Sequence, residues 1–152
     1  MPHVHVTEFV RAEPKKVLDL FRDLETFPEY MANVTSIEVV ERGAGWSVSH
    51  WVTDLDGAPL EWREMDSFDD EQCAMEFRLT EGDIEQFEGR WCFTPCDGGT
   101  RATCDLDYRL GVPVIEEAVG PTILHKVEHN MSQMLAAIKQ RLEQPDTAAK
   151  EA

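Results

Sequence analysis

Alternating apolar and polar residues between Gly45 and Leu110 predict a run of antiparallel strands. Asp56-Gly57 and Asp97-Gly98 are two-residue pairs typical of tight hairpin turns, and Asp69-Asp70 is a weaker polar turn. A longer turn around residues 81–83 supplies the remaining reversal. The stretch is therefore predicted to form five strands joined by short hairpins.

These turns fix which residues face each other, and one side of the predicted sheet is apolar and aromatic. One row across this side contains Trp51, Trp62, Phe77, Gly89 and Leu106. The rows beside it contain Ser49, Glu64, Met75, Trp91 and Cys104, and Thr53, Leu60, Leu79, Phe87 and Tyr108. Such a face belongs inside a protein. Because Gly89 leaves its row without a large side chain, we expect a cavity there.

The other side of the sheet carries charges that pair across the strands. Opposite charges face each other at Arg63–Glu76, Glu61–Arg78, Arg90–Glu76, Glu88–Arg78 and Arg90–Asp105. Directly opposed pairs of this kind favour a register by roughly 0.2–1 kcal/mol each. This side is predicted to face water, with Arg78 on it.

The rest of the chain supplies two more strands and three helices. Strands are predicted at 4–11 and 34–40, and between them a helix from Pro14 and a short second helix or turn at 27–31. Residues 114–119 are expected to form a separate turn or two, because Gly120-Pro121 breaks or kinks a helix.

From residue 123 the last helix has a single apolar stripe that can cover the sheet. The prediction is an α+β domain over 1–144, in which a curved seven-stranded antiparallel sheet wraps around the long C-terminal helix and two short helices follow strand 1. Residues 145–152 are predicted to be a disordered tail.

Charge narrows the possible partners. The 152 residues include 30 acidic and 14 basic side chains, a net charge of −16. Nucleic acids and anionic membranes repel such a chain, so neither is expected as a partner. No apolar run is long enough to insert in a membrane, and the first residues lack the features of a signal peptide. We expect a cytoplasmic protein with reduced cysteines.

Two carboxylates are candidate catalytic groups. Glu64 and Asp66 fall on the predicted apolar side, where burial raises the pKa of a carboxyl group and suits it to general acid or base catalysis. The alternatives are that the strand bulges, or that both side chains reach the rim of the sheet and solvent.

The aromatic residues around them could bind a flat, hydrophobic ligand, or could simply pack in the hydrophobic core. Phe27 and Tyr30, which precede the sheet, could line the mouth of a cavity. His125 and His129 are four residues apart, but they lie opposite the apolar stripe, and we predict no metal site.

Several stretches resemble the START/Bet v 1-like superfamily, in particular its polyketide cyclase and coenzyme Q-binding branch. They are residues 17–21, 25–30, 61–62, 81–82, 87–91 and 98–100. The resemblance extends over about residues 4–143. It implies a helix-grip fold with a cavity between sheet and helix, and no required cofactor.

The resemblance also implies roles for residues. Aromatic polyketide cyclases place a Trp and polar groups in the cavity to fold a poly-β-keto chain and assist aldol closure and dehydration. Trp62 matches their cavity Trp, and Phe27 stands where they often have Trp. Asp66 replaces one of their cavity arginines. Arg78 matches another and is a third catalytic candidate, although the charge pattern places it outside.

We interpret the protein as a cyclase or aromatase-like enzyme for a hydrophobic, ketone-bearing substrate, with an acyl carrier protein as a possible partner. The residues expected to contact the substrate are Phe27, Tyr30, Ser49, Trp51, Trp62, Met75, Phe77, Trp91 and Tyr108. The alternative is a non-catalytic carrier or chaperone of a quinone, polyprenyl or other lipid. A third possibility is a partner-binding regulator from the translation-linked, toxin-like branch of the superfamily. The acidic charge disfavours it, because contact with a ribosome usually needs a basic surface.

Overall fold

The computed structural model describes residues 2–55, 57–111 and 113–143. Seven antiparallel strands form one sheet in the order β1-β7-β6-β5-β4-β3-β2. The strands are β1 (His3–Val10), β2 (Val34–Gly43), β3 (Trp46–Leu55), β4 (Ala58–Asp69), β5 (Ala74–Gly82), β6 (Gln86–Cys96) and β7 (Gly99–Arg109). The helices are α1 (Pro14–Arg22), the short 3-10 helix η1 (Leu24–Glu29) and α2 (Pro113–Glu143). The predicted helix-grip architecture is confirmed, and the predicted tail lies outside the described residues.

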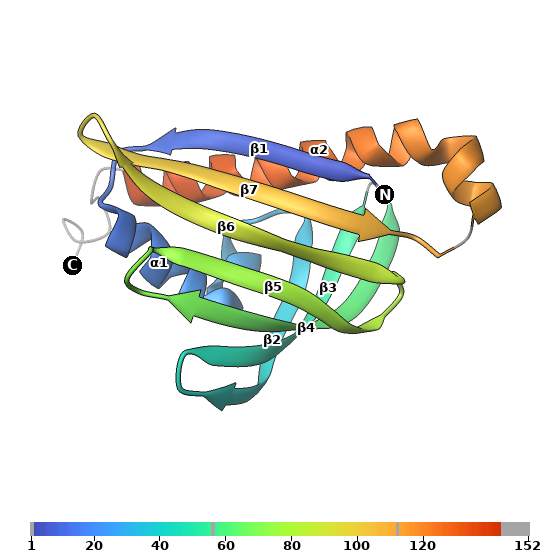
Figure 1. Ribbon diagram of the computed structural model, residues 1–152, viewed down its shortest axis with the longest axis horizontal. Helices are drawn as coiled ribbons and strands as arrows, with labels where there is room; N and C mark the ends of the chain where they lie inside the picture. Colours follow the sequence, from blue (N-terminus) through green and yellow to red (C-terminus); the bar gives the residue numbers. More distant parts are fainter. Residues whose placement is uncertain (1, 56, 112, 144–152) are drawn as a thin grey trace.

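Figure 1 shows the sheet curving around α2, which runs alongside β1. The end of α2 is tied to β1 by two hydrogen bonds: Lys139 Nζ donates to the Phe9 carbonyl at 2.7 Å, and Glu143 Oε2 accepts from the Arg11 amide at 2.8 Å. The inner faces of sheet and helix therefore enclose one apolar interior. No helix in the described ranges is both long and apolar enough to cross a membrane.

Three of the four predicted hairpin registers are confirmed. Trp51 lies opposite Trp62, Phe77 opposite Gly89, and Trp91 opposite Cys104. On the outer side, Arg90 lies opposite Glu76 and its Nη1 is 3.3 Å from the Glu76 carboxylate.

The register predicted from Asp69-Asp70 is wrong by four residues. Asp69 pairs with Ala74, so the turn spans 70–73. The Asp69 side chain accepts a hydrogen bond from the Gln72 amide at 3.0 Å, and Cys73 adopts a positive φ of 51°. A longer turn of this kind, held by a side-chain hydrogen bond, has no characteristic residue pair from which the register could be predicted.

As a consequence, Glu64 faces Leu79 instead of Met75, and Arg63, across an irregularity in the strand, faces Glu81 instead of Glu76. Glu61 correspondingly loses its predicted partner Arg78. A shift by an even number of residues keeps side chains on their predicted faces. The prediction of which side chains face the interior is therefore confirmed, although the predicted pairing of β4 with β5 is wrong.

Helix α2 is continuous from Pro113 to Glu143, so the predicted separate turn over 114–119 is wrong. The first turns of α2 do bend away from the axis of the rest (Figure 1), which agrees with the predicted kink at Gly120-Pro121. Pro121 is exposed, and a Cβ added to Gly120 would meet no atom within 4 Å. Pro121 has no backbone N–H, so it removes one hydrogen bond of the helix, which nevertheless continues through it.

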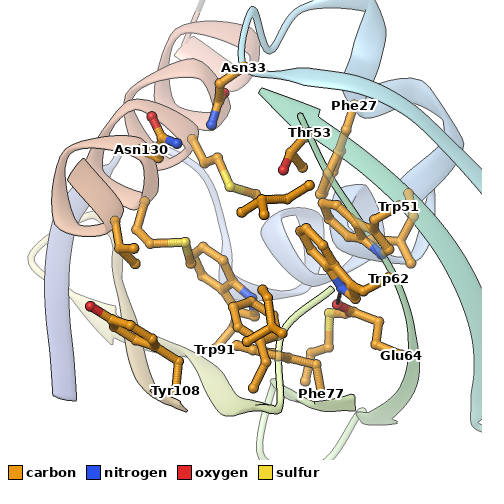
Figure 2. Close-up of a pocket in the computed structure, with 18 of the residues that line it drawn as sticks. Phe27, Asn33, Trp51, Thr53, Trp62, Glu64, Phe77, Trp91, Tyr108 and Asn130 are labelled. Atoms are coloured by element: carbon orange, nitrogen blue, oxygen red, sulfur yellow. Dashed lines mark hydrogen bonds between the residues drawn. The ribbon is translucent and has the colours of Figure 1, made fainter. Parts of the chain in front are cut away.

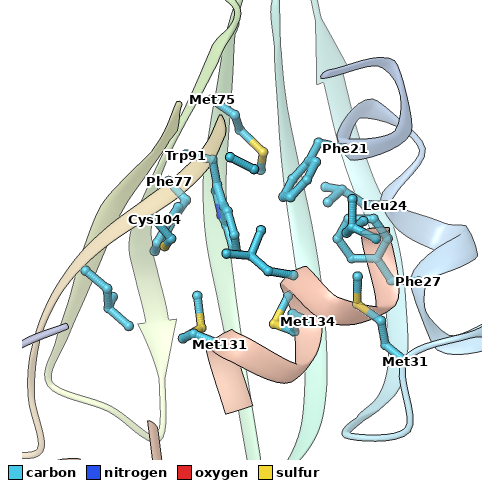
Figure 3. Packing of buried hydrophobic residues seen from close by; sticks show 14 of the residues in the cluster. Phe21, Leu24, Phe27, Met31, Met75, Phe77, Trp91, Cys104, Met131 and Met134 are labelled. Atoms are coloured by element: carbon cyan, nitrogen blue, oxygen red, sulfur yellow. The ribbon is translucent and has the colours of Figure 1, made fainter. Parts of the chain in front are cut away.

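The interior is rich in aromatic residues and methionines (Figure 3). The Phe21 ring of α1 lies 4.7 Å from that of Trp91 and 4.8 Å from that of Phe93, centroid to centroid. Met131 and Met134 of α2 face this cluster. Methionine side chains are flexible and fill irregular spaces, so this part of the core can adapt its shape.

Candidate functional site

A cavity of about 90 Å³ lies between the sheet and α2 (Figure 2). Most of its wall is aromatic or aliphatic. Of the predicted site residues, those that line it are Phe27, Trp51, Trp62, Glu64, Met75, Phe77, Trp91 and Tyr108. Binding sites for drug-sized molecules are larger, roughly 300–1,000 Å³. A ligand with two fused rings therefore fits only when flexible side chains of the wall, such as Met131 and Met134, move outward.

The stacked pair of Trp51 and Trp62 forms one wall. Their rings are 5.6 Å apart and only 10° from parallel, because the two residues face each other on β3 and β4. The Phe87 ring lies 5.2 Å from that of Trp62 and 5.3 Å from that of Phe77. Flat rings in this arrangement suit a flat ligand.

Each indole of this pair is oriented by a polar residue two positions away on its own strand. The Trp62 Nε1 donates to Glu64 Oε1 at 2.8 Å, and the Trp51 Nε1 donates to the Ser49 hydroxyl at 2.8 Å. Residues two apart on a strand share a face, so the strand itself places these groups together. The Ser49 hydroxyl in turn donates to Asp66 Oδ2 at 2.6 Å.

Glu64 and Asp66 are both buried, with 3% and 0% of their surface exposed. The alternative in which both side chains reach solvent is wrong. An irregularity is present in the strand, between Arg63 and Glu64, but it leaves both carboxylates buried. Glu64 lines the cavity, whereas Asp66 lies behind it.

The two carboxyl groups interact, and both have raised pKa values. Burial raises the pKa of Glu64 well above its ordinary value, and the nearby Asp66 raises it further. Burial also raises the pKa of Asp66, while hydrogen bonds from Glu64 and Ser49 oppose that rise. Asp66 Oδ1 is buried and has no hydrogen-bond partner among the described residues. A proton on Glu64, directed to Asp66, is the arrangement that satisfies both groups.

Two other predicted site residues lie outside the cavity wall. Ser49 supports Asp66, as described above. Tyr30 packs on Phe27, with ring centroids 6.1 Å apart, and its ring centroid lies 5.1 Å from the guanidinium carbon of Arg141. Burial raises the pKa of Tyr30. Neither residue is part of the cavity wall, and a direct substrate contact by either stays a prediction.

Arg78 does not reach the cavity. It is exposed on the outer side of β5, opposite Glu88. The charge pattern placed it correctly, and the cavity position implied by the resemblance is wrong. Gly89 also differs from its prediction, because the space beside it is filled: an added Cβ would lie 2.6 Å from Phe77 Cζ.

Sequence reasoning missed two amides that line the cavity, Asn33 and Asn130. A signal for Asn130 was present, because it lies three residues after Val127 and four before Met134, on the apolar face of the helix. Asn33 lies in the turn before β2 and carried no comparable signal.

No metal centre is apparent in the described ranges, which hold no group of three or more His, Cys, Asp or Glu able to bind a metal ion. His125 and His129 are exposed, as the helical pattern predicts. The four cysteines are free thiols.

The fold agrees with comparisons to known proteins. Residues 10–135 match the model of the family described as polyketide cyclase / dehydrase and lipid transport. The chain belongs to this family. None of the curated proteins compared matches the sequence.

Several solved structures are similar to this chain. TTHA0849 from Thermus thermophilus has 31% identity and a TM-score of 0.89, over 97% of this chain and 99% of that one. The Zhui aromatase/cyclase from Streptomyces sp. R1128 has 20% identity and a TM-score of 0.82, over 93% of both chains. A START superfamily protein from Mycobacterium smegmatis has 18% identity and a TM-score of 0.81, over 93% of this chain and 97% of that one. For the latter two, the likeness concerns the fold alone.

Proposed function

We propose that the protein is a cofactor-independent cyclase or aromatase-like enzyme, which binds a hydrophobic, ketone-bearing substrate in the cavity and assists aldol cyclisation and dehydration. The observation that carries the proposal is Glu64, a buried carboxyl group with a raised pKa that lines an otherwise largely apolar cavity. Without a substrate, the Glu64 proton is directed to Asp66. When a substrate is bound, rotation of the protonated carboxyl can redirect that proton to a carbonyl oxygen at neutral pH.

Proton transfers through Glu64 balance in three steps. In enolisation, Glu64 protonates one ketone oxygen, and a proton from the adjacent carbon returns to Glu64. In aldol closure, the enol carbon bonds to the ketone carbon, Glu64 protonates the ketone oxygen, and the enol hydroxyl proton returns to Glu64. In dehydration, Glu64 protonates the departing hydroxyl, and the proton from the adjacent carbon returns to it. Asp66 orients Glu64, and the Trp62 indole holds its Oε1. The aromatic wall excludes water and limits the shapes the substrate can adopt.

The second candidate is a non-catalytic carrier or chaperone of a quinone, polyprenyl or other lipid. The family description itself includes lipid transport, and a largely apolar wall serves either role. A carrier needs no acid in its cavity. Glu64 therefore discriminates between the two candidates.

The test uses heptane-2,6-dione, a small diketone whose aldol closure and dehydration give an enone that absorbs ultraviolet light. Glu64→Gln keeps an acceptor for the Trp62 indole but cannot donate an acidic proton, so we expect the enone-forming rate to fall by about 10²–10⁴-fold. Glu76→Gln, on the outer side of β5, is the matched control and should keep the wild-type rate.

Equal rates for wild type and Glu64→Gln would contradict the catalytic proposal. Native mass spectrometry of freshly purified protein then tests the carrier: a stoichiometric isoprenoid or quinone that is retained by Glu64→Gln would favour it. The direct roles of Asp66, Ser49 and Tyr30, an acyl carrier protein partner and a cytoplasmic location stay predictions.

A further inference from the structure

The cavity has a second polar end, away from Glu64 (Figure 2). Asn33 and Asn130 lie there with their amide groups directed into the cavity, and the Thr53 hydroxyl lies between them and the Trp62 ring. The two amides come from separate elements, the turn before β2 and the second half of α2.

A backbone hydrogen bond holds the turn that carries the first amide. The Asn33 carbonyl accepts a hydrogen bond from the Asp54 amide at 2.9 Å, which ties this turn to the end of β3. Asn130 directly precedes Met131, which is 7% exposed and anchors α2 in the core. Both side chains are therefore carried by well-packed parts of the fold.

Neither amide group is engaged by another described residue. Within the part of the chain that the structure describes, no side-chain hydrogen bond involves Asn33 or Asn130. Each amide offers two donor hydrogens and one acceptor oxygen. Groups of this kind that are half-buried beside an apolar wall are satisfied by water or by a ligand oxygen.

We propose that Asn33 and Asn130, with Thr53, form a second polar subsite that binds a hydroxyl or carbonyl oxygen at the far end of the ligand. The ligand is then a flat apolar body with one oxygen function for Glu64 and another for the amides. This inference rests on the proposed function, since it assumes that a flat molecule occupies the cavity with an oxygen at Glu64. It narrows the substrate class from hydrophobic ketones to molecules with an oxygen at both ends.

Two naphthols with the same ring system test the subsite by isothermal titration calorimetry. 2,6-Dihydroxynaphthalene can reach both ends, whereas 2-naphthol has one oxygen. One satisfied hydrogen-bonding site corresponds to roughly a tenfold difference in affinity. We expect the dihydroxy compound to bind wild type about tenfold more tightly.

Leucine at the subsite should remove that difference. In Asn33→Leu and Asn130→Leu, 2-naphthol can still use Glu64, so its affinity should stay within about twofold while that of the dihydroxy compound falls about tenfold. Gln133→Leu replaces an exposed amide on the same helix and should preserve the wild-type ratio. Circular dichroism checks that each variant folds.

Equal affinities of the two naphthols for wild type would overturn the subsite without any variant being needed. A ratio that persists in both leucine variants would overturn the assignment to these amides. If neither compound binds wild type, the subsite and the flat-ligand part of the proposed function both fail. If both bind and only the Glu64→Gln rate test fails, the subsite stands and belongs to a carrier.

Discussion

At the scale of single residues, the site depends on a few hydrogen bonds that hold polar groups in an apolar interior. Four buried groups form one connected set: the Trp51 indole, the Ser49 hydroxyl and the Asp66 and Glu64 carboxyls. The Trp62 indole completes it at Glu64. Buried polar groups are stable only when each has a hydrogen-bond partner. Here, the proton on Glu64 supplies the hydrogen bond between the two carboxyl groups.

Stability should therefore depend on pH through Glu64. Its pKa is raised in the folded state by burial and by Asp66, so folding takes up a proton. This contribution is fully present below the unfolded pKa of about 4.3 and is lost as pH rises through the folded pKa.

Glu64→Gln has no such proton to lose. Compared with wild type, we expect a similar unfolding midpoint at pH 4 and a higher one at pH 8, measured by thermal denaturation at both values. Glu76→Gln, which replaces an exposed carboxylate, should follow wild type at both pH values. A midpoint difference for Glu64→Gln that is the same at pH 4 and pH 8 would contradict the assignment.

At the scale of elements, glycine has opposite effects in the sheet and in the helix. On β6, a Cβ at Gly89 would lie 2.3 Å from the Asp105 carbonyl oxygen and 2.6 Å from Phe77 Cζ. On α2, a Cβ at Gly120 would meet nothing within 4 Å. At Gly89, the neighbouring strand and the Phe77 ring lie too close to leave room for a side chain. At Gly120, there is room for one.

The same substitution should therefore change stability in opposite directions. Gly89→Ala forces strands or the Phe77 ring apart and should lower the free energy of unfolding by about 1–3 kcal/mol. Gly120→Ala should raise it by about 0.5–1 kcal/mol, because alanine favours the helix. Urea denaturation measures both. A stable Gly89→Ala would show that the Phe77 ring moves aside easily, and a destabilised Gly120→Ala would show that α2 needs flexibility there.

At the scale of the whole molecule, an excess of negative charge surrounds the apolar interior. The net charge of −16 repels itself across the surface, even though opposed pairs such as Arg90 and Glu76 offset part of it. An acidic surface also constrains any protein partner, since a second acidic chain would be repelled unless salt or a local basic patch intervened.

Salt should accordingly stabilise the fold. Raising NaCl from 0.02 M to 0.5 M shortens the screening length from about 20 Å to about 4 Å, which weakens repulsion over the whole surface. We expect the thermal midpoint to rise by a few degrees, on the order of 1 kcal/mol of stability. Sucrose, which carries no charge, separates this effect from general stabilisation by a solute. A fall in the midpoint with NaCl would mean that the surface ion pairs outweigh the repulsion.

The sequence by itself determined the order of the elements and the two sides of the sheet, because hydrophobic periodicity and local turns are properties of neighbouring residues. It therefore placed Glu64 and Asp66 inside and Arg78 outside. Only the tertiary structure decided the pairing of β4 with β5, since a four-residue turn capped by Asp69 replaced the two-residue turn that was expected. It also decided which inward residues meet empty space. Phe77 fills the gap at Gly89. Helix packing brings Asn130 of α2 to the same end of the cavity as Asn33 near β2. These segments are far apart in the chain, so no local sequence pattern encodes their arrangement.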